Sequence, residues 1–388
     1  MDSKRPFLDY YETLGTVPVR QDVRDIRAHF ERREALYRLL GLPPRFFALA
    51  QVLEFGPGLG HNAIYVASLR PERYVLVDGS RQAIAGLRET LAKGGIPLDR
   101  VEIVESEARA FRSESLFDVV LAENMIPMQR EPRSFCRAIA SHVRPGGVLV
   151  ITCQDSISYL GEILRRAVAL KVASPELDLA TRVRRLLPIF APHLKKLPAT
   201  TRPAEDWIAD NVTHPLIGQF FSISDAIEAL SADFEFYGGS PHFLTEWRWY
   251  KELFGAGRRF NEEATLAFES SAVRFIDWRL GAGAHEPEFG HNLRAACDVV
   301  WERVKEAEEK PAGGDFERIA AACAAVAAAL ESNAPISSAA IREVIAFLLT
   351  ADEASSFRFD AFEGFFGRTQ YVSFIRRASR QDEQERRG

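Results

Sequence analysis

The chain has 388 residues, with 49 Lys and Arg against 54 Asp and Glu, giving a formal net charge of −5. This length allows roughly two or three domains, and the acidic balance argues against general affinity for DNA, which requires clustered basic residues. The four cysteines are far apart and form no CxxC pair, which fits a reducing compartment and excludes a zinc ribbon. The N-terminus has no signal-peptide core, and no apolar run reaches the ~18 residues of a membrane span. We therefore expect a soluble, cytoplasmic protein.

The first predicted element is an amphipathic helix at Gln21–Leu40, which Gly41 and Pro43-Pro44 bring to an end. We assign residues 1–47 to an N-terminal helical cap.

Short, continuous apolar runs alternate with helical stretches between Gln51 and Cys153. The helical stretches include 80–93 and 134–142, and the apolar runs occupy residues 52–55, 74–78, 101–104, 117–121 and 147–152. Buried apolar strands that alternate with helices indicate a parallel sheet built from βαβ units. Residues 48–156 are therefore predicted to form an α/β core.

The remainder of the chain is predicted to be mostly helical, with two returns to the core. A helix is expected at 157–185, after which Pro188, Pro192, Pro198 and Pro203 are expected to break the pattern. Ser222 is expected to cap a helix at 226–230, before a strand at 234–237; further on, 247–305 is expected to be helical with Gly-rich interruptions. The predicted segments are a helical insertion acting as a substrate lid (157–222), a return to the core (223–245), a second helical insertion (246–366), the final strand (367–377) and a flexible tail (378–388).

A glycine-rich turn, Gly56-Pro57-Gly58-Leu59-Gly60, joins the first predicted strand to a helix. Glycines at such a turn let the backbone approach a ligand closely. Asp78 ends the second strand, where a carboxylate can hold ribose hydroxyls. Both features indicate a nucleotide or nucleoside site.

Glu54 helps to decide whether this turn binds a dinucleotide or a nucleoside without phosphates. A carboxylate two residues before the first glycine is unfavourable near a pyrophosphate, as in nicotinamide enzymes, but suits a ligand with sulfonium and α-ammonium groups. Pro57 and Leu59 add bulk to a loop that need not wrap phosphates. A nucleoside without phosphates is therefore favoured.

Five motifs in this order and spacing resemble the class I S-adenosylmethionine-dependent methyltransferases: EFGPGLGHN, LVDGS, VEIVESEARAF, FDVVLAENMIP and HVRPGGVLVITC. The resemblance covers about residues 48–153, and the strands near 234–237 and 370–375 are similar to the closing hairpin of that family. It implies an α/β fold with a Rossmann-like seven-stranded methyltransferase sheet, a last strand that is antiparallel, and helical insertions. The implied cofactor is S-adenosyl-L-methionine.

The resemblance also implies a cofactor site. Its glycines would border the methionine part, Asp78 would hold the ribose, and Glu107 would contact the adenine amino group. Ser106-Glu107-Ala108 departs from the G-D-A run that is usual in the family. The implied cofactor-binding residues are Glu54, Gly56, Pro57, Gly58, Gly60, Asp78, Gly79, Ser80, Glu107, Ala108, Glu123 and Asn124.

The methyl acceptor is less well defined. Residues 158–202 carry nine basic against three acidic residues, which would suit an acidic substrate, a carrier protein, a membrane surface or simply a solvated helix face. Aromatic residues between Trp207 and Tyr250 could wall an apolar pocket or form a core. His242 is the first candidate base and His61 the second. Tyr11, next to Tyr10, would close the site. The histidines near 285–291 lack metal-binding spacing, so no metal is expected.

We therefore predict methyl transfer to O or N of a small-molecule acceptor, acidic or lipid-like, held under a helical lid. The alternatives are polyamine synthase-like aminopropyl transfer, a non-catalytic S-adenosylmethionine-binding interaction module and, more distantly, a nicotinamide oxidoreductase. No DNA partner is expected, contact with a membrane surface ranks behind the small-molecule acceptor, and a homodimer is compatible with the helical insertions.

Overall fold

The computed structural model describes residues 10, 20–214, 218–310, 315–350 and 357–378. The chain divides into two compact units. We call residues 1–154, 217–268 and 369–388 the core unit, and residues 155–216 and 269–368 the helical unit. Segments 217–222 and 246–268, which the sequence analysis placed in the insertions, thus belong to the core unit.

The core unit contains one seven-stranded sheet in the order β3-β2-β1-β4-β5-β7-β6. β1 to β5 are parallel, and β7 is antiparallel to both β5 and β6. This confirms the predicted Rossmann-like fold. The strands are β1 (Gln51–Phe55), β2 (Arg73–Asp78), β3 (Val101–Glu105), β4 (Phe117–Ala122), β5 (Val143–Cys153), β6 (Phe234–Ser240) and β7 (Gln370–Arg376).

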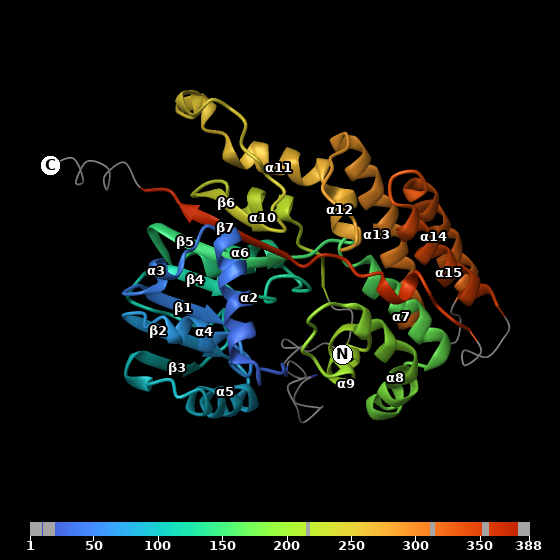
Figure 1. The fold of residues 1–388 in the computed structure, drawn as a ribbon, viewed down its shortest axis with the longest axis horizontal. Coiled ribbons are helices and arrows are strands. Elements are labelled where there is room, and N and C mark those ends of the chain that lie inside the picture. Colours follow the sequence, from blue (N-terminus) through green and yellow to red (C-terminus); the bar gives the residue numbers. More distant parts are fainter. Residues whose placement is uncertain (1–9, 11–19, 215–217, 311–314, 351–356, 379–388) are drawn as a thin grey trace. The chain divides into compact units, whose positions relative to one another are not determined.

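Helices lie against this sheet (Figure 1) and pack on it through a continuous apolar core. Tyr37 of α2 and Tyr65 of α4 stack at 5.9 Å, and both belong to the cluster that covers Val52, Tyr74 and Leu121. α2 begins after Asp25, whose side chain accepts the Ala28 N–H at 3.0 Å and so caps the first turn. The helices of the core unit are α2 (Ile26–Leu39), α3 (Pro44–Phe47), α4 (Ala63–Ser68), α5 (Arg81–Lys93), α6 (Pro132–Ala140), α10 (Ile223–Leu230) and the greater part of α11 (Phe260–Ser270).

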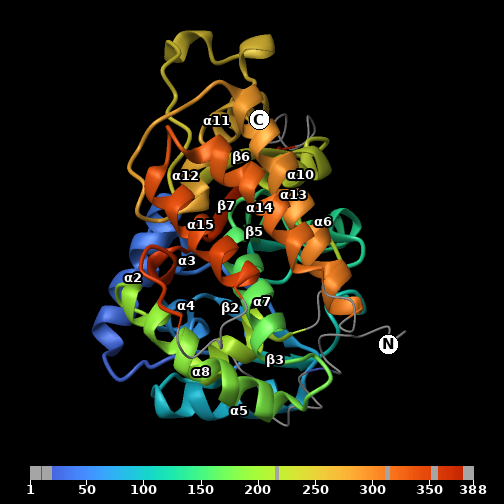
Figure 2. The same cartoon turned by 90° about the vertical axis from the view of Figure 1, so that its right-hand side faces the viewer.

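In the helical unit, α13, α14 and α15 lie side by side (Figure 2). Its helices are α7 (Leu160–Val172), α8 (Leu179–Lys196), α9 (Ala204–Trp207), α12 (Ala272–Ile276), α13 (Pro287–Glu309), α14 (Phe316–Leu330) and α15 (Pro335–Leu349). None of the helices in the described part of the chain is long and apolar enough to cross a membrane.

The prediction of a single helix at 157–185 was wrong. The structure has two helices, because residues 173–178 interrupt the pattern and Asp178 caps α8 by accepting the Thr181 N–H at 3.0 Å. α8 then continues through Pro188 and Pro192, which were expected to break it. Because Pro188 has no backbone N–H, the Arg184 carbonyl loses its partner within the helix. Both residues are exposed, so water can hydrogen-bond to that carbonyl instead.

The helix predicted from residue 247 was also wrong over its first part. The segment forms only short 3-10 turns at Tyr250–Glu252 and Gly255–Gly257 before α11 starts at Phe260. Two glycines and four aromatic residues within 247–257 have low helix propensity, which accounts for the irregular backbone.

Candidate active site

The glycine loop connects β1 to α4 at the edge of the sheet where β1, β2, β4 and β5 end. Gly56, Gly58 and Gly60 have φ angles of +67°, +56° and +81°, a region that disfavours other residues. A Cβ on Gly56 would lie 2.2 Å from the Met125 sulfur. The loop therefore requires glycine, and it leaves the backbone bare where a ligand can approach.

Gly56→Ala is expected to weaken cofactor binding at least about 10-fold, because it combines backbone strain of about 1–2 kcal/mol with displacement of Met125. Gly95→Ala is the matched control: Gly95 has φ +63°, and no atom lies within 4 Å of the position of its added Cβ. The control should lose stability but keep its affinity for S-adenosylhomocysteine, measured by calorimetry. Equal affinity in both variants would contradict the expected role of Gly56.

Asp78 lies at the end of β2 and anchors the loops around it. Its Oδ2 accepts the Gly58 N–H at 3.2 Å and its Oδ1 accepts the Ser80 N–H at 2.8 Å. Burial raises the pKa of Asp78, and these two hydrogen bonds partly oppose the rise. Each carboxylate oxygen can accept a further hydrogen bond, so the group fits the two hydroxyls of a ribose.

The residues predicted on either side of the adenine lie near Asp78. The Ser80 hydroxyl caps α5 by accepting the Ala83 N–H at 3.2 Å, and Gly79 is half-buried. The Ser106 N–H donates to the Asp78 carbonyl at 3.0 Å, which brings the loop after β3 beside Asp78. In that loop Ala108 is half-buried and Glu107 is exposed. The structure thus brings the predicted ribose and adenine positions together.

Glu54 is buried at the end of β1, and the Tyr74 hydroxyl donates a hydrogen bond to its carboxylate. Burial, and then the negative charge of Glu123, raise the pKa of Glu54 from 4.5 to about 7, while Tyr74 and Arg33 oppose the rise. A ligand cation placed beside Glu54 would stabilise its carboxylate form. The site therefore fits the sulfonium and α-ammonium groups of the predicted cofactor.

Glu54→Gln is expected to make the ligand-free protein more stable at alkaline pH. Since the folded-state pKa lies above 4.5, the stability that the protonated carboxyl provides is complete at low pH and is lost as the pH rises through about 7. Between pH 5 and pH 8 the wild type should lose about 2–3 kcal/mol relative to the variant. Urea unfolding of both proteins at the two pH values measures this difference. A stability difference that does not change with pH would contradict the raised pKa.

Glu123 follows β4 and is held by two residues of α2. The Arg33 guanidinium binds both carboxylate oxygens, with Nη1 to Oε2 at 3.0 Å, and the side chains are only 8% and 9% exposed. The Tyr37 hydroxyl donates to Glu123 Oε1 at 3.1 Å, and the Asn62 amide donates to Oε2 at 3.5 Å. Glu123 is therefore fixed in one orientation near the glycine loop.

β7 contributes to the same cluster. Burial, and then the negative charge of Glu123, raise the pKa of Tyr371 to about 12, while nearby Arg33 and Asn124 oppose the rise. Asn124 has φ +54°, which turns the chain sharply after β4. We call Glu54, Tyr74, Arg33, Tyr37, Glu123 and Tyr371 the polar cluster.

The sequence analysis missed four members of the polar cluster: Arg33, Tyr37, Tyr74 and Tyr371. The sequence did contain one indication that Arg33 is buried. Arg33 precedes Tyr37 by four residues, so both lie on the same face of α2, and that face carries the buried residues of the helix. A buried guanidinium needs polar partners for its charge, and a carboxylate is the usual one. That partner, Glu123, lies 90 residues away in the sequence.

The predicted catalytic residues are not brought together. His61 is half-buried, burial lowers its pKa, and its carbonyl accepts a hydrogen bond from His29 Nε2 at 2.7 Å. His242 is exposed and follows β6, which is the edge strand of the sheet. β6 lies three strand positions from β4, so the two strands are about 14 Å apart across the sheet. Tyr11 lies outside the described residues. His61 and His242 as bases therefore remain predictions.

Five of the nine basic residues in 158–202 bind groups of the helical unit itself. Four of them are buried or half-buried, so the expectation of a solvated face was wrong for these four, whereas Lys196 is exposed. Arg165 lies 3.7 Å from the Phe366 ring centroid and donates to the Phe365 carbonyl at 2.9 Å. The other four bind acidic side chains or carbonyl oxygens: Arg166 to Glu308, Lys171 to the Phe347 carbonyl, Lys196 to Glu363 and Arg202 to Asp210.

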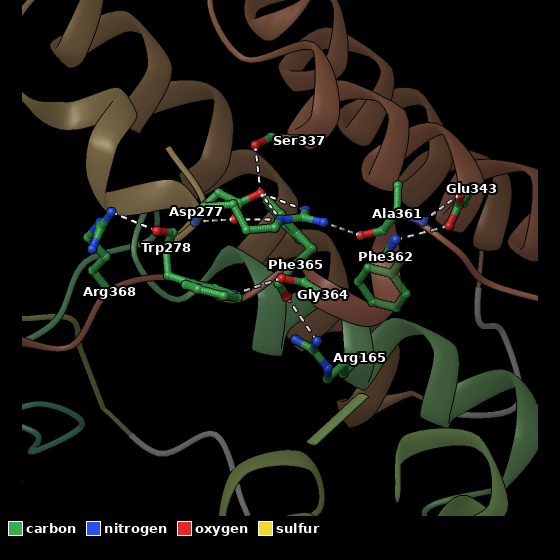
Figure 3. A network of polar contacts seen from close by, with 11 residues as sticks. Arg165, Asp277, Trp278, Ser337, Glu343, Ala361, Phe362, Gly364, Phe365 and Arg368 are labelled. Carbon is green, nitrogen blue, oxygen red and sulfur yellow. Dashed lines mark hydrogen bonds and ion pairs between the residues drawn. The ribbon is translucent and has the colours of Figure 1, made fainter. Parts of the chain in front are cut away.

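Arg165 belongs to a network that holds the segment leading to β7 (Figure 3). In this network Trp278 Nε1 donates to the Gly364 carbonyl at 3.1 Å, and Glu343 accepts the backbone N–H groups of Ala361 and Phe362. The basic charge in this region is therefore largely structural. Within the described residues, no group of three or more His, Cys, Asp or Glu side chains could hold a metal ion.

Comparison with known proteins identifies relatives of this chain. A family described as a methyltransferase domain matches residues 27–230. The cypemycin N-terminal methyltransferase of a Streptomyces species is 33% identical over 112 residues, which are 28% of this chain and 43% of that protein. The chain thus aligns with less than half of this curated relative.

Solved structures with a similar fold are more distant. The N-methyltransferase NodS from Bradyrhizobium japonicum WM9, in complex with S-adenosyl-L-homocysteine, is 19% identical, with a TM-score of 0.31 over 38% of this chain and 74% of that one. PKMT2 from Rickettsia typhi, in complex with AdoHcy, is 15% identical, with a TM-score of 0.43 over 60% of this chain and 48% of that one.

The family match covers more than half of the chain and includes the glycine loop, Asp78 and the whole run from β1 to β5. The cofactor is S-adenosylmethionine. The glycine loop, Asp78 and Glu54 are the residues predicted to contact its methionine part, its ribose and its cationic groups. The chain belongs to the methyltransferase-domain family and is a class I S-adenosylmethionine-dependent methyltransferase.

Proposed function

We propose that this enzyme methylates an oxygen or nitrogen of a small molecule whose acceptor atom reaches the carboxyl end of β4. The observation that carries the proposal is the fixed position of Glu123, held by Arg33 and Tyr37 beside the glycine loop. S-adenosylmethionine supplies the methyl group on a sulfonium centre. The residues of the polar cluster contribute orientation and a partly water-excluded site, which are the main requirements of an in-line displacement.

Among these acceptors we favour nitrogen. The polar cluster contains two carboxylates, Glu54 and Glu123, and one guanidinium, Arg33, so it carries one net negative charge when Glu54 is ionised. This charge belongs to Glu54 and pairs with the cationic end of the cofactor, so it selects the cofactor and leaves no charge in the cluster that would attract an acidic acceptor. The basic residues that suggested an acidic acceptor are largely internal to the helical unit. The name of the cypemycin relative, an N-terminal methyltransferase, points in the same direction.

A neutral amine needs no general base, whereas a protonated one must lose a proton before it attacks. At neutral pH Glu54, with a pKa of about 7, is the titratable member of the polar cluster. We assign it no catalytic step, because its expected partner is the cationic end of the cofactor.

The helical lid is a further part of the proposal. The helical unit begins at residue 155, directly after β5 and the carboxyl ends of the parallel strands, so its place in the chain order suits a cover for the acceptor. A lid that excludes water would strengthen the interactions of the transferred methyl group.

The test is incubation of the enzyme with S-adenosylmethionine and panels of amines, alcohols, phenols and carboxylic acids, followed by detection of S-adenosylhomocysteine. We expect amines to stimulate its release. Stimulation by carboxylic acids alone would contradict the nitrogen proposal. Release of methylthioadenosine would indicate aminopropyl transfer, and cofactor binding without any product would indicate the non-catalytic alternative.

A further inference from the structure

Four large aromatic side chains are exposed on one loop of the core unit, between β6 and α11. The exposed fractions are 88% for Trp247, 58% for Trp249, 66% for Tyr250 and 74% for Phe254. We call residues 247–257 the aromatic loop. Figures 1 and 2 both show this segment, in yellow before α11, standing out from the rest of the core unit.

The aromatic loop is held in shape by its own hydrogen bonds. Arg248 Nη1 donates to the Gly257 carbonyl at 2.8 Å and so joins the two ends of the loop. Within the loop the Glu252 N–H donates to the Trp249 carbonyl at 2.8 Å and the Gly257 N–H donates to the Phe254 carbonyl at 2.9 Å. The aromatic side chains are therefore presented outward by a fixed backbone.

Two of the four exposed rings lie beside a lysine. The Trp249 and Tyr250 rings lie 4.9 Å apart, and Lys251 Nζ lies 5.9 Å from each centroid. By contrast, Trp207 and Trp301 are only 6% and 4% exposed. Exposure of large apolar side chains in one patch marks an interaction surface.

The chemistry of the loop selects a lipid bilayer among the partners such a surface could have. Trp and Tyr combine an apolar ring with a polar group and concentrate at membrane–water interfaces, and lysine extends its ammonium group to the headgroups. Three of the four basic residues in 246–259 pair with acidic side chains: Arg248 with Glu246, Arg258 with Glu235 and Arg259 with Glu263. Lys251, in the middle of the loop, is exposed, and its charge complements anionic headgroups.

We propose that the aromatic loop docks this methyltransferase onto membrane surfaces that carry anionic lipids. Trp247, Trp249 and Phe254 insert into the interface, while Lys251 remains with the headgroups. The attachment is peripheral, and it is independent of the acceptor proposed above.

The experiment uses the full chain and vesicles of phosphatidylcholine with or without phosphatidylserine. We expect co-sedimentation with the phosphatidylserine vesicles, a blue shift of tryptophan emission, and quenching by brominated acyl chains, because the two most exposed tryptophans lie in the loop. Raised salt should weaken the binding.

The triple variant Trp247→Ser, Trp249→Ser, Phe254→Ser should bind these vesicles at least about 10-fold more weakly. The matched control is Leu49→Ser, Leu98→Ser, Leu266→Ser, which removes three other apolar side chains that are 66%, 45% and 53% exposed. The control should bind like the wild type, and calorimetry with S-adenosylhomocysteine should show both variants folded. Equal loss in both variants, or no binding by the wild type, would overturn the proposal. Self-association that only the loop variant abolishes, without vesicle binding, would instead make the loop a contact between copies.

Discussion

Replacing Asp78 by Ala is expected to weaken binding of S-adenosylhomocysteine by about two to three orders of magnitude. The carboxylate is placed to accept hydrogen bonds from both ribose hydroxyls, and hydrogen bonds to a charged group contribute about 1.5–3 kcal/mol each. It also holds Gly58 and Ser80 through their N–H groups, so the loops around the ligand lose a common anchor. Asp78→Asn should have an intermediate effect, since it keeps one acceptor oxygen but loses the charge. Titration calorimetry measures both.

Asp118 provides the matched control, because it lies at the start of β4, at the opposite end of the parallel strands from Asp78. Its carboxylate accepts the Gln51 N–H at 2.8 Å and binds Arg144, so it too anchors the backbone. Asp118→Ala should lower the stability of the protein and leave cofactor affinity unchanged. If both variants lost affinity equally, the effect of Asp78 would be structural and not a matter of ligand contact.

Arg33→Met is expected to destabilise the protein by about 3–5 kcal/mol, the usual result of leaving one partner of a buried ion pair uncompensated. The side chains of Arg33 and Glu123 are both less than a tenth exposed. Without Arg33, Glu123 would keep only hydrogen bonds from neutral groups, those of Tyr37 and Asn62. Urea unfolding at pH 8 gives the loss directly.

A double-mutant cycle separates the ion pair from the packing of the arginine side chain. Glu123→Gln in the Arg33→Met background removes the buried charge and should restore most of the lost stability. Failure of this second substitution to restore any stability would mean that Arg33 acts through its contacts with Tyr37 and Tyr371 instead.

The core of the fold could be predicted because its strands are buried on both faces. Runs such as Tyr74–Asp78 are continuously apolar up to the final carboxylate, and they alternate with helices at a regular spacing. Glu54 and Asp78, the residues predicted to bind the cofactor, lie at the carboxyl ends of such strands, so the topology alone places them on the same side of the sheet.

The polar cluster could be predicted only in part, because its members come from distant parts of the chain. Arg33 lies on α2 and Tyr371 on β7, and nothing local indicates that they meet Glu123 and Asn124. The burial of Arg165 could not be predicted from local sequence patterns for a similar reason. Its contacts are the Phe366 ring and a backbone carbonyl about 200 residues away, neither of which is marked by charge in the sequence.

The most direct test of the whole account is a crystal structure of this enzyme with S-adenosylhomocysteine. We predict that both ribose hydroxyls lie within about 3 Å of the Asp78 carboxylate, a hydrogen-bond distance. The homocysteine part should lie along Gly56–Gly60, with its α-ammonium group on the side of Glu54. A ligand bound away from the glycine loop, or with its ribose turned away from Asp78, would contradict the assignment of this edge of the sheet as the active site.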